Sequence, residues 1–173
     1  MKSRNIGLAV AFVLAGVGFG QAADTSDTWL TTKAKIALLT TDGVSATAVN
    51  VDTVDGTMTI HGKVGTAAEK AKAEATVRKL DGVKDVKNLL QVVPEDQKKM
   101  VDANDSDVKD RVEASLKATK TMDDIKVASV NKGVVLLSGK TASLGQELLA
   151  IEHVYTVAGV RRVSSEIETV ENN

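Results

Sequence analysis

Cysteine is absent from this chain of 173 residues. The absence excludes disulfides, thiol nucleophiles and thiolate metal sites. It also excludes a lipid-anchored N-terminus, because such an anchor needs a cysteine at the cleavage point. Any role of the chain must therefore depend on other chemistry.

Aromatic residues and an excess of positive charge are also missing. Aromatics make up only 2% of the chain, with Trp29 as its one tryptophan and Tyr155 as its one tyrosine. Few surfaces are therefore available for stacking bases or sugars. The chain has 22 basic residues, of which Lys2 and Arg4 lie in the N-terminal segment. Without these two, 20 basic residues stand against 23 acidic ones, a net charge of −3. This composition argues against nucleic-acid and glycan binding.

The first 22 residues have the pattern of a secretory signal peptide. Lys2 and Arg4 precede an uncharged apolar run at residues 6–19, and small residues occupy the positions that a signal peptidase reads in Gly20-Gln21-Ala22. The run is shorter than the roughly 20 residues that span a bilayer. We therefore expect cleavage near Ala22 and a periplasmic product without a transmembrane segment, the alternative being an uncleaved anchor.

The rest of the chain contains two copies of one sequence repeat, at residues 27–94 and 105–171. Over the second half of each copy a single offset of 77 positions superimposes glycines and apolar residues. The repeat is far longer than the roughly 20 to 50 residues of solenoid units and so indicates two small domains. The paired structural glycines are Gly56 with Gly133, Gly62 with Gly139, and Gly82 with Gly159.

Each copy predicts the element order α-β-β-α-β. Helical spacing of apolar residues opens each copy, and alternating residues around Gly56 and Gly133 predict a hairpin. Thr66-x-x-Glu69 and Ser143-x-x-Gln146 are capping boxes that start a second helix. Gly82 and Gly159 then stop this helix, each with the positive φ that glycine adopts without steric cost, before an alternating last strand. The fold class is α+β, with a three-stranded sheet covered by helices on one face. Residues 95–104 are a charged linker, either a tether or a helical extension, and leave the domain orientation open.

The glycine spacing resembles that of the BON domain. The resemblance covers residues 27–171 and rests on scaffold motifs, not on a catalytic signature. Those motifs are the pairs Gly56/Gly62 and Gly133/Gly139, the turns Asp81-Gly82-Val83 and Ala158-Gly159-Val160, and the closing Val-x-Asn/Ser-x-Leu/Ile strands. It implies an envelope-stress protein, induced by osmotic stress, whose domains attach to phospholipid membranes. Chaperone-like help to unfolded exported or outer-membrane proteins is the second activity that the resemblance implies.

Candidates for chemistry are few. His61 and His153 are the only histidines, they are not counterparts in the repeat, and neither has a partner at ligand spacing. Asp123-Asp124 and Glu166-x-Glu168 lack the dense oxygen spacing of a calcium loop and suit solvated faces. We therefore predict no catalytic residue, no metal, no cofactor and no enzymatic activity.

The candidate contact residues are basic or apolar and lie in the second copy. Their basic members are diluted by neighbouring acids, which is also the pattern of a solvated helix. The face of the return strand that carries Thr59 and His61 in the first copy carries Val134 and Leu136 in the second. Such a face could reflect β-branched preference, dock on the other repeat, or meet lipid or an unfolded client. The candidates are Lys109, Arg111, Lys117, Lys120, Val134 and Leu136.

Overall fold

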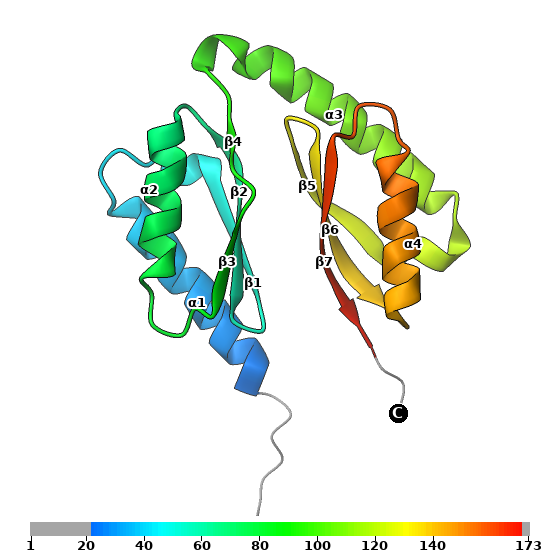
Figure 1. Ribbon diagram of the computed structural model, residues 1–173, viewed down its shortest axis with the longest axis horizontal. Helices are drawn as coiled ribbons and strands as arrows, with labels where there is room; N and C mark the ends of the chain where they lie inside the picture. Colours follow the sequence, from blue (N-terminus) through cyan, green and yellow to red (C-terminus); the bar gives the residue numbers. More distant parts are fainter. Residues whose placement is uncertain (1–21, 171–173) are drawn as a thin grey trace, which may run out of the picture.

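The computed structural model describes residues 22–170, so the predicted signal peptide lies outside the described residues apart from Ala22. These residues form two units, each a sheet covered by two helices on one face (Figure 1). The predicted α+β class with two tandem domains is confirmed. Within residues 22–170, no helix combines the length and the apolar character needed to cross a membrane.

The first domain holds α1 (Ala22–Leu39), a short 3-10 turn η1 (Ala46–Ala48), and the hairpin β1 (Val49–Val54) and β2 (Thr57–Val64). It continues with α2 (Ala67–Arg78), β3 (Asp85–Asn88) and β4 (Gln91–Val92). Strand β2 is central: β1 pairs with it antiparallel, and β3 and β4 pair with it parallel. The expected last strand is thus divided in two at residues 89–90, although the Leu89 N–H still donates to the Ile60 carbonyl of β2 at 2.8 Å.

The second domain holds α3 (Glu95–Lys117), the turn η2 (Lys120–Met122), β5 (Ile125–Asn131), β6 (Val134–Thr141), α4 (Leu144–Tyr155) and β7 (Arg162–Thr169). Its order is β5-β6-β7, with β5 antiparallel and β7 parallel to β6. The residues expected as a linker form the first turns of α3 without a break, so the helical extension is the alternative that the structure adopts.

Both hairpin turns have the two left-handed residues that a type I′ turn requires, with φ of 52° at Asp55 and 78° at Gly56 in the first. The Asp27 carboxylate of α1 accepts hydrogen bonds from both N–H groups, at 2.7 and 2.9 Å. Asp105 of α3 does the same for the turn at residues 132–133. One repeated aspartate therefore ties the first helix of each domain to its hairpin.

The predicted capping boxes are present at the second helix of each domain. The Thr66 hydroxyl accepts from the Glu69 N–H at 3.0 Å, and the Ser143 hydroxyl accepts from the Gln146 N–H at 3.3 Å. The Glu69 carboxylate reaches back to the N–H of Gly65 at 2.9 Å. Each box satisfies backbone donors that the helix itself leaves free.

The helices that follow these boxes end slightly before the glycines that were expected to stop them. Helix α2 ends at Arg78 and α4 at Tyr155, while Gly82 and Gly159 lie in the next turn with φ of 99° and 94°. The predicted positive φ at both glycines is confirmed, and the turn aims the chain back into the last strand.

Each domain has its own apolar core between sheet and helices. The first is built around residues with no exposure, such as Met58 and Ile60, and the second around Val135 and Leu137. On β6 these core residues alternate with Val134 and Leu136, which therefore point away from α3 and α4.

Candidate functional site

The helix-free faces of the two sheets lie opposite each other (Figure 1). Val134 and Leu136 are 8% and 1% exposed although they belong to neither core. Leu89, Val93 and Val101 are likewise buried outside both cores. We call these five residues the interdomain apolar group. Docking on the other repeat is the arrangement that the structure adopts for this face.

Ion pairs close one end of this interface, next to the connection from β4 to α3. The Lys63 ammonium of β2 lies 2.6 Å from Asp102 and 2.8 Å from Asp105 of α3. Burial disfavours the charged ammonium, but the two carboxylates outweigh burial and raise the pKa of Lys63. Lys132 adds a hydrogen bond of 3.2 Å to the carbonyl of Val92. We call this end the spine of the interface.

Farther from the spine, polar groups of both sheets meet. His61 Nε2 lies 2.9 Å from an Asp52 carboxylate oxygen, and Glu166 of β7 faces this pair from the second domain. Burial raises the pKa of Glu166, and the Asp52 charge adds to this effect, whereas Thr59, His61 and Lys87 favour the charged form. The Thr59 hydroxyl is close enough to influence Glu166, but no hydrogen bond of standard geometry joins them.

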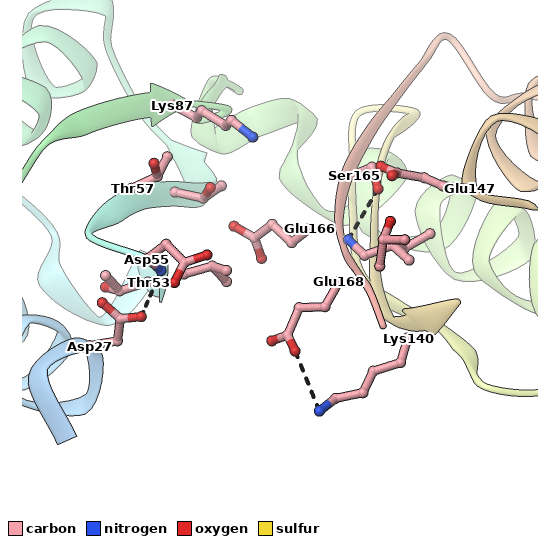
Figure 2. A pocket seen from close by; sticks show the side chains of 14 residues that line it. Asp27, Thr53, Asp55, Thr57, Lys87, Lys140, Glu147, Ser165, Glu166 and Glu168 are labelled. Atoms are coloured by element: carbon pink, nitrogen blue, oxygen red, sulfur yellow. Dashed lines mark hydrogen bonds and ion pairs between the residues drawn. The ribbon is translucent and has the colours of Figure 1, made fainter. Parts of the chain in front are cut away.

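An open cleft of about 740 Å³ continues from these groups to the surface. Figure 2 shows Asp27 and Asp55 on one wall, and Glu166 and Glu168 reaching across from the other. Lys140 pairs with Glu168 at 3.4 Å. Carboxylates thus dominate both walls, so the cleft repels anions and suits no anionic headgroup.

Helix α4 presents an apolar stripe to solvent. Leu144, Leu148 and Tyr155 are 60%, 56% and 60% exposed and follow each other at helical spacing, with the half-buried Ile151 between them. Leu149 is 59% exposed beside the stripe. Large aliphatic side chains gathered on one exposed helix face are typical of an interaction surface.

The four basic candidates are all exposed but do not form one patch. Lys117 ends α3 and Lys120 lies in η2, and α4 packs against both of these elements. Arg111 instead lies beside Gly159, and Lys109 lies 3.7 Å from Glu113. Lys117 and Lys120 are thus exposed cations on elements that contact the helix carrying the apolar stripe.

Val134 and Leu136, the apolar candidates, lie inside the interdomain contact. A lipid or a client could reach them only if the domains separated. The stripe on α4 was missed, although the repeat offset could have revealed it: Leu144, Leu148 and Tyr155 replace the small or charged residues Ala67, Ala71 and Arg78.

The histidines lie in different domains and have local partners. His153 Nε2 is 2.8 Å from the Ser115 hydroxyl, which joins α4 to α3, and His61 is held by Asp52. In the part of the chain that the structure describes, no cluster of three or more His, Asp or Glu side chains could hold a metal ion. The described residues therefore offer two separate surfaces, the exposed apolar stripe of α4 and the acidic cleft between the domains.

Comparison with known families identifies the class. The BON domain matches residues 26–94 and 104–171, which together make up most of the chain. The chain therefore belongs to the BON-domain family and contains two copies of the domain.

Among individual proteins, the chain is similar to Osmotically-inducible protein Y of Escherichia coli K12, with 40% identity over 65 residues. The match spans 38% of this chain and 32% of that relative. Two structures of CdsD, a structural protein of the type III secretion system of Chlamydia trachomatis, have TM-scores of 0.35 and 0.36 at 14% and 12% identity. The first match covers 84% of this chain and 67% of the CdsD chain. The second covers 83% of this chain and 93% of the CdsD chain. TM-scores this low support no inference.

Proposed function

We propose that the chain is a non-catalytic protein of the bacterial periplasm that serves under osmotic stress and binds phospholipid membranes peripherally through α4. The stress role is suggested by the name of the similar Escherichia coli protein, and the compartment by the predicted signal peptide. The apolar stripe of Leu144, Leu148 and Tyr155 carries the membrane proposal.

The physical basis is the combination of an apolar helix face with cations on the elements that contact this helix. Leucine side chains that enter the acyl boundary gain about 0.8 kcal/mol per buried CH₂. A tyrosine at the end of the stripe suits the headgroup region, where its ring is apolar and its hydroxyl is wet. Lys117 and Lys120 can each add about 1 kcal/mol at an anionic surface. The contact should therefore be weak and reversible.

The test replaces the stripe with the residues of the other domain. Leu144→Ala with Leu148→Ala gives α4 the alanines that α2 has at the matching positions. Both side chains are more than half exposed, so the fold should persist. Co-sedimentation with liposomes of phosphatidylglycerol and phosphatidylethanolamine should weaken about tenfold or more, given the apolar area lost.

The matched control introduces Ala67→Leu and Ala71→Leu in α2. These exposed positions should then form a second stripe and strengthen liposome binding. Lys117→Gln with Lys120→Gln should weaken binding less and reduce its salt dependence. Binding that depends on the lysines and is unchanged by both leucine exchanges would overturn the role of α4.

A second candidate function is the holding of unfolded exported proteins, favoured by the interdomain apolar group. A client contact of this kind should survive salt and be lost when Val134 and Leu136 are made polar. If anionic liposomes fail to sediment the protein even at low salt while it suppresses aggregation of an unfolded outer-membrane protein, this candidate replaces the membrane proposal.

A further inference from the structure

Three polar atoms between the two sheets are buried without a hydrogen-bond partner among the described residues. They are Thr59 Oγ1, His61 Nδ1 and Glu166 Oε1. Thr59 and His61 are 1% and 5% exposed and belong to β2, whereas Glu166 belongs to β7. A buried polar atom without a partner costs free energy, and the cost is greatest for an ionised carboxylate. The docked arrangement therefore penalises a charged Glu166 more than a separated arrangement would.

We propose that the contact between the two sheets is a pH-sensitive latch: it is closed while Glu166 is protonated, opens when Glu166 is ionised, and then uncovers Val134 and Leu136. The proposal rests on the position of Glu166 between the domains and is independent of membrane binding. It also gives the second candidate function a control, because the covered apolar face becomes available only in the open form.

The geometry allows opening without loss of either core. The two core clusters share no residue, and the chain crosses between domains once, at Pro94 before α3. Lys63 with Asp102 holds the spine. Glu166 lies toward the other end, where the cleft of Figure 2 already separates the sheets. Rotation about the spine would hydrate Glu166 first.

Charges around Glu166 come from every strand that faces it. Their sum is mixed, so burial decides the direction of the effect. They are Asp52 of β1, Asp55 of the β1–β2 turn, His61 of β2, Lys87 of β3, Lys140 of β6, Glu147 of α4 and Glu168 of β7, with Asp27 and Lys35 of α1 across the cleft.

Proton linkage gives the direction in which pH changes the ratio of open to closed molecules. Burial raises the pKa of Glu166 in the closed form above its value in the open, hydrated form. The closed contact is therefore at full strength below the open-form pKa and loses strength as pH rises toward the closed-form pKa. Between those two values the ratio of open to closed molecules should rise about tenfold per pH unit, because opening releases one proton.

The absence of cysteine makes a distance measurement direct. Ala75→Cys on α2 and Glu152→Cys on α4 place spin labels at exposed sites of the outer helices. Pulsed electron resonance from pH 5 to pH 9 should show one short distance in acid and a growing longer population as pH rises. Wild-type distances that do not change over this range would overturn the latch.

Three variants assign the effect. Glu166→Gln keeps the shape but cannot ionise, so the short distance should persist at every pH. Glu168→Gln, at an exposed carboxylate, should keep a wild-type transition, and His61→Gln should keep a transition of the same direction with its midpoint moved to higher pH, because His61 favours the charged form of Glu166. A Glu166→Gln profile like that of the wild type, or a profile lost in Glu168→Gln or His61→Gln, would overturn the assignment to Glu166.

Discussion

Helices α2 and α4 occupy equivalent places in the two domains but present different surfaces. Both start with a capping box and bury small or branched residues, Ala73 and Val77 in α2 and Ala150 and Val154 in α4. Their exposed positions differ throughout. Ala67, Ala71, Glu74 and Arg78 of α2 correspond to Leu144, Leu148, Ile151 and Tyr155 of α4. The two copies thus share the scaffold, while only in the second copy does the second helix of the domain carry an apolar stripe.

The helix-free faces of the two sheets also differ, since the first is polar and the second is partly apolar. The first domain offers Thr59 and His61, and the second offers Leu136 with Glu166. A polar face packed on a partly apolar one leaves polar atoms without partners, so we expect this contact to be weaker than either core.

The largest expected effect tests whether the scaffolds are equivalent. Gly62 and Gly139 have φ of 135° and 126°, and a Cβ at either would overlap a backbone carbonyl oxygen, that of Ala48 or of Asp124. Gly62→Ala and Gly139→Ala should each cost at least about 3 kcal/mol and unfold their own domain first. Residue-resolved hydrogen exchange measures this, and an unperturbed variant would contradict the equivalence.

A smaller effect should distinguish the two domains. A Cβ at Gly82 would lie 3.0 Å from Leu30 Cδ2, the end of a flexible side chain, but at Gly159 it would lie 2.6 Å from Val108 Cγ2. Because Val108 is branched at Cβ, its methyl group cannot rotate away as the end of Leu30 can. Gly159→Val should therefore destabilise its domain more than Gly82→Val does. Both should exceed about 1 kcal/mol by urea denaturation. Wild-type stability in both would refute the argument.

Much of the fold was predictable because it depends on local rules. Glycine spacing, capping boxes and alternation specify elements from neighbouring residues, and the paired glycines Gly82 and Gly159 have the expected φ. The division of the last strand at Leu89 was not predicted. There Asn88 Oδ1 accepts a hydrogen bond from the Leu90 N–H at 3.1 Å, a side-chain contact that alternation does not reveal.

The site was less predictable than the fold. Burial of Leu136 and Glu166 depends on how two domains meet, and the charged segment before α3 does not determine this. The sequence predicted a solvated face at Glu166, and this prediction is wrong because Glu166 faces the first domain across the interface. The stripe on α4 is different: Leu144 and Leu148 were visible in the sequence, and only comparison of the exposed helix positions would have revealed them.

Acid should affect the two capping boxes unequally. Burial would raise the pKa of Glu69, but backbone N–H groups including that of Ser45, at 2.6 Å, outweigh it and lower the pKa. Stability from ionised Glu69 is thus present above its unfolded-state pKa and lost as pH falls through the lowered folded-state value. Gln146 of the second domain does not titrate. Below this range the first domain should lose about 1 kcal/mol more than the second.

The measurement uses the distribution of aromatic residues. Trp29 reports on the first domain and Tyr155 on the second, so fluorescence during urea unfolding at several acid pH values separates them. Glu69→Gln should remove the additional acid sensitivity of the Trp29 transition, and Gln146→Glu should introduce it into the Tyr155 transition. Equal acid sensitivity of the wild-type domains would contradict the assignment.

The smallest effect is expected from removal of both histidines. His61 and His153 lie in different domains; His61 contacts Asp52 at 2.9 Å, and His153 contacts the Ser115 hydroxyl at 2.8 Å and the Ser115 carbonyl at 3.3 Å. Glutamine can form comparable bonds, so His61→Gln with His153→Gln should change unfolding free energy by less than about 1 kcal/mol. Liposome binding should be unchanged, because neither ring belongs to the stripe on α4. Loss of the biological activity in a folded double variant would instead indicate acid–base chemistry, since proton transfer is what glutamine cannot replace.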